Sequence, residues 1–243
     1  MRKCALITGA SGGIGSAIAL RLANDGFNIA ACYHSDEKGI KELEKKLEAV
    51  GVEYRIYKTD VSDMNSVRKT FADATDYFGG VSVLVNNAGM AQQKLFTDIT
   101  EDEFDRITDV NFKGVFNCCQ CAVPYMVRCK SGKIINISSM WGVCGASCET
   151  VYSATKAAVI GLTKALAREL APSNVQVNCV APGAIDTKMN SNLSDDDKKA
   201  FAGEIPMGRF GTPEEIAGVV SFLSGKDSDY VTAQVITADG GLT

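Results

Sequence analysis

The stretch Thr8-Gly-Ala-Ser-Gly-Gly-Ile-Gly15 constrains the fold most, because it joins a short apolar strand at 3–7 to an apolar helical run that starts near Ala17. Glycines in this turn let the backbone approach a phosphate closely. The start of the following helix presents unpaired N–H groups and a partial positive charge. A strand, a glycine turn and a helix in this order predict a unit that binds the pyrophosphate of a dinucleotide.

Strand patterns alternate with helical patterns along the rest of the chain. Further strands are predicted at 27–33, 53–58, 81–85, 133–137, 175–180 and about 235–237. Helix starts are predicted at Ser62, at the capping box of Thr100 and Glu103, and at the Thr212-Pro-Glu-Glu215 segment. Alternation at this pace predicts an α/β fold with a parallel sheet covered on both faces, and 243 residues suit one domain, 1–243.

The helical and strand periodicity weakens between Ala184 and Met207, where Ser194 precedes a short predicted helix. Irregular stretches between ordered elements often cover a ligand. We therefore expect a substrate lid at about 184–207.

The charge and composition of the chain argue against a nucleic-acid-binding protein, a membrane protein, a disulfide-rich protein and a metalloprotein. The net charge of -4 gives no electrostatic footprint for nucleic acid or for an anionic membrane. We see no signal peptide and no apolar run near the roughly 18 residues of a membrane span, so we expect a soluble, cytoplasmic protein. Nine cysteines do not suggest a disulfide framework. Cys118 and Cys121 have no second pair or histidine cluster beside them, and we expect no metal site.

Tyr152 and Lys156 lie four positions apart, on one face of a predicted helix that continues with apolar residues to about Ala171. A free tyrosine has a pKa of about 10. A nearby ammonium favours the phenolate, so we expect Lys156 to lower the pKa of Tyr152. The pair suits general acid–base catalysis on a carbonyl or an alcohol.

Six motifs in order resemble the motif set of the classical short-chain dehydrogenases/reductases. They are Thr8-Gly9-x-x-x-Gly13-x-Gly15, Asn86-Asn-Ala-Gly89, Asn111, Ser139, Tyr152-x-x-x-Lys156 and Pro182-Gly183. The resemblance covers essentially the whole chain. It implies a single Rossmann-type domain with a seven-stranded parallel sheet, usually assembled as a homotetramer.

The resemblance also implies catalytic roles for four residues. Tyr152 resembles the acid/base, and Lys156 the residue that lowers its pKa and binds the nicotinamide ribose. Ser139, rather than Ser138, has the family's spacing to the tyrosine and would hold the substrate oxygen. Asn111 would support a water-linked proton relay behind Lys156.

Most of the cofactor contacts implied by the resemblance come from the turns that follow the strands, and Tyr152 and Lys156 come from the predicted helix. The contacts are Gly9, Ser11, Gly13, Ile14, Gly15, Asp60, Val61, Asn87, Ala88, Gly89, Tyr152, Lys156, Pro182, Gly183, Ile185 and Thr187, with Asp60 reading the adenine amino group.

The identity of the nicotinamide cofactor is expected to depend on the end of the second strand. Tyr33 stands where NAD-dependent relatives carry an acidic residue, so NADP(H) is favoured over NAD(H), with His34 and Ser35 as contacts of the 2′-phosphate. Gly12 departs from the basic residue that many NADP-dependent relatives carry.

The segment Met207–Glu215 and the C-terminal Asp239-Gly-Gly241 resemble the 3-oxoacyl-[acyl-carrier-protein] reductases of bacterial fatty acid synthesis. That resemblance implies reduction of a β-keto thioester with NADPH. It also implies acyl carrier protein as a partner, docked by basic residues at the mouth of the active site. Lys130, with Arg128 nearby, matches one such residue, but Ser173 stands at the second position, which weakens electrostatic steering.

A second resemblance points to another substrate. The segment from Met140 to Glu149 contains Trp141 and lies where the family lines its substrate pocket. It resembles reductases that act on an amino-pentanone modification of elongation factor P, and Glu149 would pair with the amine of such a substrate. A regulatory NAD(P)-binding protein without catalysis is disfavoured because Tyr152 and Lys156 are both present.

Overall fold

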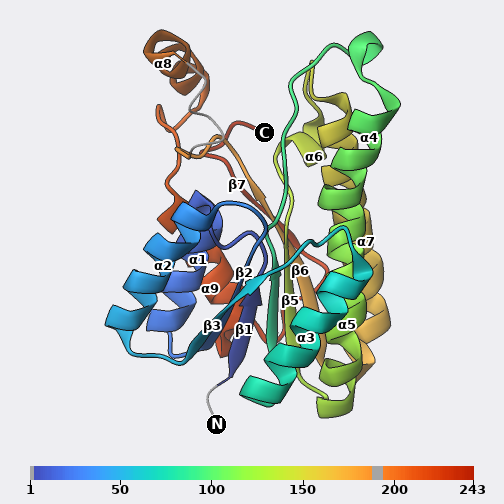
Figure 1. Ribbon diagram of the computed structural model, residues 1–243. Helices are drawn as coiled ribbons and strands as arrows, with labels where there is room; N and C mark the ends of the chain where they lie inside the picture. The colour runs from blue at the N-terminus through green and yellow to red at the C-terminus, as the bar shows by residue number, and fades with distance from the viewer. Residues whose placement is uncertain (1–2, 188–193) are drawn as a thin grey trace.

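Seven parallel strands form one sheet between two layers of helices in the computed structural model, which describes residues 3–187 and 194–243 (Figure 1). The strand order is β3-β2-β1-β4-β5-β6-β7. The strands are β1 (Cys4–Ile7), β2 (Asn28–Tyr33), β3 (Tyr54–Lys58), β4 (Val83–Asn86), β5 (Gly132–Ile137), β6 (Val175–Pro182) and β7 (Val235–Ala238). The predicted α/β class and the parallel seven-stranded sheet are confirmed.

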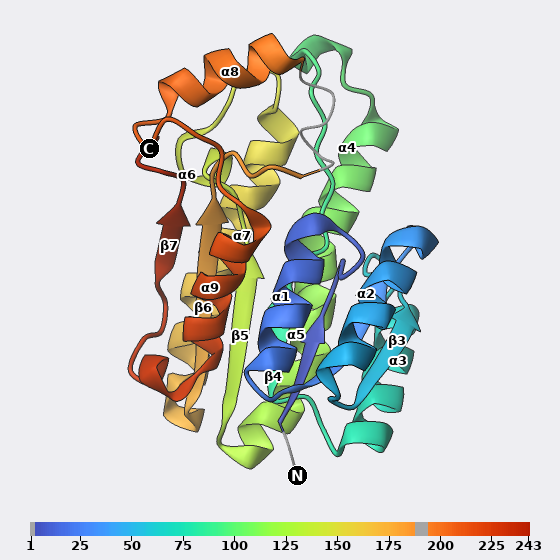
Figure 2. The same cartoon turned by 90° about the vertical axis from the view of Figure 1, so that its left-hand side faces the viewer.

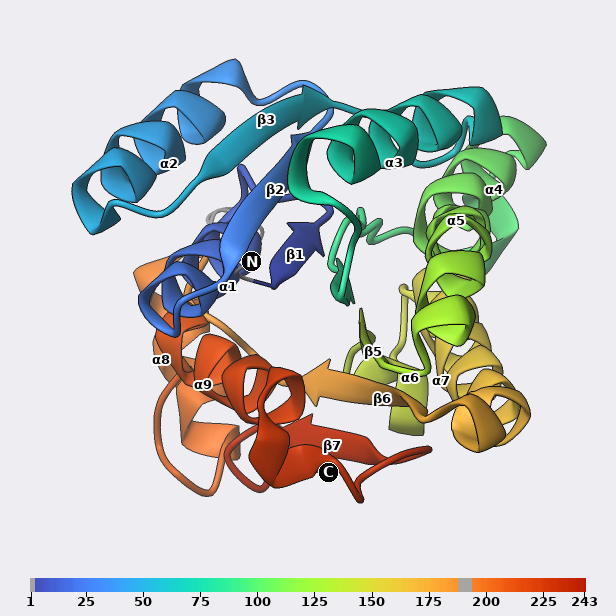
Figure 3. The same cartoon turned by 90° about the horizontal axis from the view of Figure 1, so that it is seen from below.

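The helices divide between the two faces of the sheet (Figures 1 and 3). One face carries α1 (Gly13–Asn24), α2 (Glu37–Val50) and α9 (Pro213–Ser224); the other carries α3 (Met64–Phe78), α4 (Glu101–Thr108), α5 (Gly114–Cys129) and α7 (Thr150–Leu170). Two further helices, α6 (Trp141–Cys144) and α8 (Asp195–Glu204), lie beyond the carboxyl ends of the strands (Figure 2). This end of a parallel sheet is where ligands bind in such folds.

A separate apolar cluster fills each side of the sheet. On the α1 side, Leu22, Leu43 and Val220 are fully buried against the strands, and on the α5 side Val115 and Met126 are buried. Fully burying one such side chain contributes about 1.5–3 kcal/mol. The two clusters hold the strand ends, and hence the site, in a fixed arrangement.

The capping residues explain where three helices begin. The predicted capping boxes of Thr100 with α4 and Thr212 with α9 are both present. The prediction for Ser62 is wrong, because Asp63 caps α3 by accepting from the backbone N–H groups of Asn65 and Ser66 at 3.0 and 3.1 Å. A carboxylate offers two acceptor oxygens at this position, and the Ser62 hydroxyl instead donates to Asp60 at 2.6 Å.

The predicted helix that passes Asn111 is interrupted. A π-helical turn at Asp109–Lys113 separates α4 from α5, and Asn111 within it is fully buried. Such turns are frequent at functional sites, and they move a side chain out of the regular helical register.

All nine cysteines are free thiols. Burial raises the pKa of Cys4, Cys32 and Cys119 to about 12, which makes these three thiols poor nucleophiles and poor metal ligands. Across the described residues, no three potential ligands gather in a way that could hold a metal ion, and no helix combines the length and the hydropathy that a membrane crossing requires.

Candidate active site

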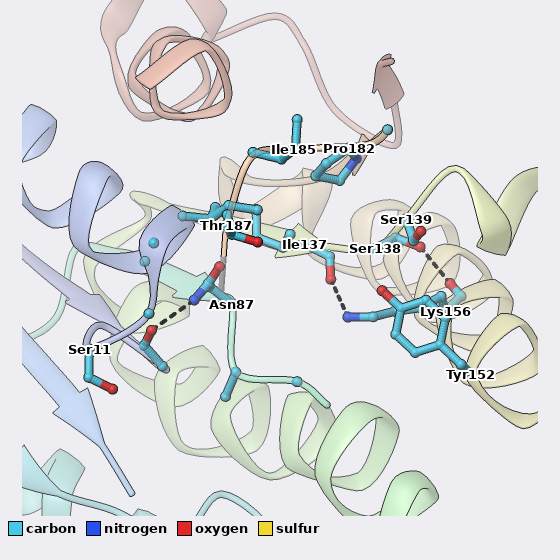
Figure 4. A pocket seen from close by; sticks show the side chains of 18 of the residues that line it. Ser11, Asn87, Ile137, Ser138, Ser139, Tyr152, Lys156, Pro182, Ile185 and Thr187 are labelled. Carbon is cyan, nitrogen blue, oxygen red and sulfur yellow. Dashed lines mark hydrogen bonds between the residues drawn. The ribbon is translucent and has the colours of Figure 1, made fainter. Parts of the chain in front are cut away.

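Two pockets open at the carboxyl ends of the strands. The first has a volume of about 470 Å³ and is shown in Figure 4. It is lined by Gly9, Ser11, Gly12, Gly13, Ile14, Gly15, Asp36, Asn87, Ala88, Gly89, Ile137, Ser138, Ser139, Tyr152, Lys156, Pro182, Gly183, Ile185 and Thr187.

The glycine turn forms one wall of the first pocket and fits a pyrophosphate. Gly9 has a φ of +65°, which favours glycine, and a Cβ added there would lie 2.9 Å from the Cα of Ala88. A Cβ added at Gly13 would lie 3.0 Å from Cγ2 of Thr187. Gly12 stands at the N-cap of α1, where it has no side chain to cover the N–H groups of the first turn. The backbone is therefore bare where an anion would bind.

The turn after β4 holds the glycine turn in place. The side-chain amide of Asn87 donates to the carbonyl oxygens of Thr8 and Gly9 at 3.0 and 3.1 Å. In return, Oγ1 of Thr8 accepts from the backbone N–H groups of Asn87 and Ala88, both at 3.0 Å. These bonds fix the separation between the two turns that face each other across the pocket.

All but four of the expected cofactor contacts line the first pocket; the exceptions are His34, Ser35, Asp60 and Val61. His34 and Ser35 are exposed after β2, and Val61 is buried after β3. Bonds from Ser62 hold the pKa of Asp60 below its usual value, and Nε2 of His34 lies 3.9 Å from Oδ2 of Asp60. The four residues thus stand beside the pocket, at the ends of β2 and β3.

Four lining residues were not expected from the sequence: Gly12, Asp36, Ile137 and Ser138. Asp36 caps α2 by accepting from the Gly39 N–H at 2.9 Å, and the Ser-Asp pair before a helical pattern was a readable capping signal. Ile137 and Ser138 directly precede Ser139 at the end of β5, so the strand end was the signal for them.

The second pocket has a volume of about 770 Å³ and shares Ser139, Tyr152 and Gly183 with the first. It is lined by Ala91, Gln92, Gln93, Ser139, Met140, Trp141, Gly145, Ala146, Ser147, Glu149, Tyr152, Gly183, Ala184 and Phe201. The expected pocket residues Met140, Trp141 and Glu149 are all among them. Phe201 comes from α8 and Ala184 follows β6, both inside the expected lid at 184–207; positions 188–193 of that lid lie outside the described residues.

Tyr152 is buried where the two pockets meet. Burial raises the pKa of its hydroxyl, the hydrogen bond with Ser139 lowers it, and the charge of Glu149 raises it. The expected lowering of this pKa by Lys156 is therefore wrong. The ammonium of Lys156 instead donates to the Ile137 carbonyl at 2.9 Å, 5.7 Å from the tyrosine ring centroid, and burial lowers its own pKa to about 8 (Figure 4).

Asn111 lies behind Lys156, with Gly89 between them. A Cβ added at Gly89 would lie 3.2 Å from the lysine Nζ and 3.4 Å from Oδ1 of Asn111. The amide of Asn111 binds the backbone of Met90 twice, accepting from its N–H at 2.8 Å and donating to its carbonyl at 2.9 Å. The side chain therefore clamps the turn that passes between the two pockets.

The basic residues expected at the mouth of the site lie elsewhere in this chain. Lys130 caps the C-terminus of α5, and β5 begins at Gly132, so Lys130 lies at the amino ends of the strands. Ser173 likewise precedes β6. The first pocket is at the opposite, carboxyl ends of the same strands, because its lining residue Ser138 directly follows β5 and its lining residue Pro182 ends β6. The expectation that Lys130 and Arg128 flank this chain's own active site is wrong.

Burial of the Lys156 ammonium predicts a pH-dependent stability. The pKa of a solvated lysine is 10.5 and that of Lys156 in the fold is about 8, so between these values the unfolded chain binds more protons. The burial penalty is fully present below pH 8 and is relieved as the pH rises toward 10.5. We expect urea denaturation to show that, between pH 7.5 and pH 10, the free energy of unfolding of wild type rises by on the order of 2 kcal/mol relative to that of Lys156→Met. Lys164→Met, at an exposed position, is the control. A difference in the free energy of unfolding between wild type and Lys156→Met that does not change with pH would contradict the lowered pKa of Lys156.

Comparisons with known proteins agree with this geometry. The sequence profile of the family described as "Enoyl-(Acyl carrier protein) reductase" matches residues 9–243. A relative from Staphylococcus aureus, named 3-oxoacyl-[acyl-carrier-protein] reductase FabG, is 43% identical over 242 residues, covering 100% of this chain and 98% of its own. The relative of the same name from Thermotoga maritima is 42% identical over 240 residues, covering 99% of this chain and 97% of its own.

A solved structure extends the likeness to three dimensions. The crystal structure of a short-chain type dehydrogenase/reductase from Mycobacterium marinum superposes with a TM-score of 0.94 at 37% identity, covering 99% of this chain and 95% of the other. The fold, the motif set and the full-length relatives agree, and the chain belongs to the short-chain dehydrogenase/reductase family of NAD(P)H-dependent oxidoreductases.

Proposed function

We propose that this protein reduces a ketone to a secondary alcohol, with Tyr152 as the proton donor. The observation that carries the proposal is the junction of the two pockets at the hydroxyl groups of Ser139 and Tyr152. A nicotinamide cofactor bound in the first pocket supplies a hydride. A ketone in the second pocket would place its oxygen against the two hydroxyls that both pockets share.

The residues around the junction have complementary tasks. Ser139 and Tyr152 donate hydrogen bonds to the oxygen on which negative charge develops, which stabilises the transition state. The raised pKa of Tyr152 keeps its proton in place at neutral pH until that charge appears. Lys156, charged below pH 8, then stabilises the phenolate and binds the nicotinamide ribose. Asn111 supports a water-linked relay that returns the proton from behind Lys156.

We propose NADP(H) as the preferred cofactor. Tyr33 ends β2 without a carboxylate at that position, and His34 and Ser35 stand exposed beside the pocket, where they can approach a 2′-phosphate. The carboxylate of Asp36 lines the pocket but is engaged as the cap of α2.

A 3-oxoacyl thioester, carried by acyl carrier protein, is the first substrate we propose. The support is the full-length similarity to relatives named for that reaction, together with the size of the second pocket. If the carrier protein docks on Lys130, it does so at the strand ends opposite the pockets of the same subunit. Assembly as a homotetramer, which we also propose, is what could bring Lys130 to the pocket of a neighbouring copy.

An amine-bearing ketone, such as the amino-pentanone modification of elongation factor P, is the second candidate. Glu149 lines the second pocket, and burial raises the pKa of its carboxyl. Gln92 lines the same pocket, and its side-chain Oε1 is a buried acceptor that makes no hydrogen bond to any described residue. The partly desolvated Glu149 carboxylate, in the same pocket as Trp141, favours a substrate that carries a hydrogen-bond donor, because an unpaired buried acceptor costs free energy.

Glu149→Gln separates the two substrates. Steady-state oxidation of NADPH is followed with acetoacetyl coenzyme A, acetoacetyl carrier protein, amino-pentanone and the uncharged pentanone. If the amine-bearing ketone is the substrate, kcat/KM for amino-pentanone falls about tenfold to a hundredfold in the variant, because a hydrogen bond to a charged group contributes about 1.5–3 kcal/mol. The exposed Glu169→Gln is the control. If the carrier-bound thioester is turned over fast and at the same rate by wild type and by Glu149→Gln, the first candidate is supported. If no ketone is turned over, the proposed function is contradicted.

A further inference from the structure

A buried threonine lies between the proposed acid and its lysine. Thr155 is 5% exposed as a residue, and its hydroxyl donates to the carbonyl oxygen of Tyr152 at 2.8 Å and accepts from Nδ2 of Asn111 at 3.3 Å. A threonine hydroxyl has one proton to donate. Because that proton goes to the Tyr152 carbonyl, the lone pairs of Oγ1 face Asn111 and select the donating side of its amide.

The orientation of the Asn111 amide matters for the turn that passes between the pockets. In the observed orientation, Oδ1 accepts from the Met90 N–H and Nδ2 donates to the Met90 carbonyl. A flipped amide would place two donors against each other at the Met90 N–H and two acceptors at its carbonyl. Gly89, just before Met90, lines the first pocket, and Ala91, just after it, lines the second.

Three elements are therefore linked in series. The Thr155 hydroxyl joins α7, which carries Tyr152, to Asn111 on the π-helical turn, and the Asn111 amide joins that turn to Met90 after β4. The π-helical turn is what brings Asn111 into reach of both partners. We propose that Thr155 is a positioning residue, which fixes the backbone of Tyr152 relative to Met90 and so aligns the proton donor with both pockets. This inference rests on the proposed role of Tyr152.

Thr155→Val tests the proposal, because valine keeps the shape and removes the hydroxyl. We expect kcat for ketone reduction to fall about tenfold, because small misplacements of reacting groups cost this much or more. The KM values for NADPH and for the ketone should stay within about twofold, since Thr155 contacts neither ligand. The solvent isotope effect on kcat should increase, because proton transfer becomes slower relative to the other steps. Thr155→Ser, which restores the hydroxyl, should recover kcat to within about twofold of wild type.

Thr163 provides a matched control on the same helix. Its hydroxyl is also buried, donates to a backbone carbonyl at 2.8 Å and accepts from the amide of Asn136 at 2.8 Å, but it lines neither pocket. Thr163→Val should lower the melting temperature about as much as Thr155→Val and leave kcat unchanged. A variant that loses only general stability would behave like this control.

Three results would overturn the inference: wild-type kcat in Thr155→Val, a Thr155→Ser variant as slow as the valine variant, or an equal loss of kcat in Thr163→Val. If circular dichroism shows that Thr155→Val does not fold, Thr155→Ala is used in its place and its kcat is compared with that of Thr155→Ser. Tyr152→Phe separates this failure from failure of the proposed function. A normal Thr155→Val beside an inactive Tyr152→Phe overturns the positioning role alone, whereas an active Tyr152→Phe overturns the proposed function.

Discussion

Tyr152→Phe is expected to lower kcat for ketone reduction about a thousandfold, because a positioned general acid contributes about 10²–10⁴-fold to the rate. The hydroxyl is the only group removed, and it stands at the junction of the two pockets beside Ser139. The ring stays buried, so the fold and the first pocket should be unchanged. Burial raises the pKa of this hydroxyl, so at neutral pH the wild-type group is protonated rather than a phenolate, as the proposed role requires.

Stopped-flow absorbance of NADPH, at saturating cofactor and ketone, measures this loss in a single turnover. Fluorescence titration should give the same dissociation constant for NADPH in the variant and in wild type. Tyr230→Phe, at a fully exposed position, is the matched control and should keep full activity. A variant that retains more than about a tenth of wild-type kcat would show that another group supplies the proton.

Gly15→Ala is expected to abolish cofactor binding. A Cβ added at Gly15 would overlap the carbonyl oxygen of Gly9 and would lie 2.6 Å from Nδ2 of Asn87. The same Asn87 nitrogen donates to that Gly9 oxygen at 3.1 Å, so the methyl group would displace both turns that face the first pocket. Because backbone atoms cannot move away cheaply, we expect the dissociation constant for NADPH to rise at least about a hundredfold and the free energy of unfolding to fall by about 2 kcal/mol.

Calorimetric titration with NADPH and urea denaturation measure the two effects. Gly218→Ala in α9 is the control, because a Cβ there meets only the guanidinium of Arg21 at 4.0 Å. Replacing a helical glycine by alanine should raise the free energy of unfolding by about 0.5–1 kcal/mol and leave cofactor binding unchanged. Wild-type affinity for NADPH in Gly15→Ala would contradict the assignment of the glycine turn to the pyrophosphate.

Local sequence patterns predicted most of the fold. The glycine turn, the two capping boxes and the period of the apolar residues in α2 report interactions between near neighbours, and the structure contains all of them. The sequence predicts the wrong capping residue for α3, because Ser62 and Asp63 are both residue types that cap helices well. Asp63 is the cap in the structure, and the Ser62 hydroxyl makes a competing hydrogen bond to Asp60.

The electrostatics of the site could not be read from sequence. The spacing predicts that Lys156 lies beside Tyr152. Desolvation is the largest cause of both pKa shifts, and the Ser139 hydrogen bond and the Glu149 charge also act on Tyr152. These effects depend on packing between distant segments. The position of Lys130, at the far end of the sheet, likewise depends on the length and direction of α5. The bonds between Thr155, Asn111 and Met90 required the π-helical turn, which has no clear sequence signal.

Transfer of deuterium from NADPH labelled at the hydride-donating carbon shows whether this protein reduces a ketone. The label is followed by mass spectrometry into the alcohols formed from acetoacetyl coenzyme A, acetoacetyl carrier protein and amino-pentanone, with labelled NADH in parallel. We predict one deuterium on the former carbonyl carbon of at least one of these products, faster from NADPH than from NADH, and none with Tyr152→Phe over the same time. Binding of NADPH without deuterium in any of the three alcohols would contradict the account of this protein as a ketone reductase.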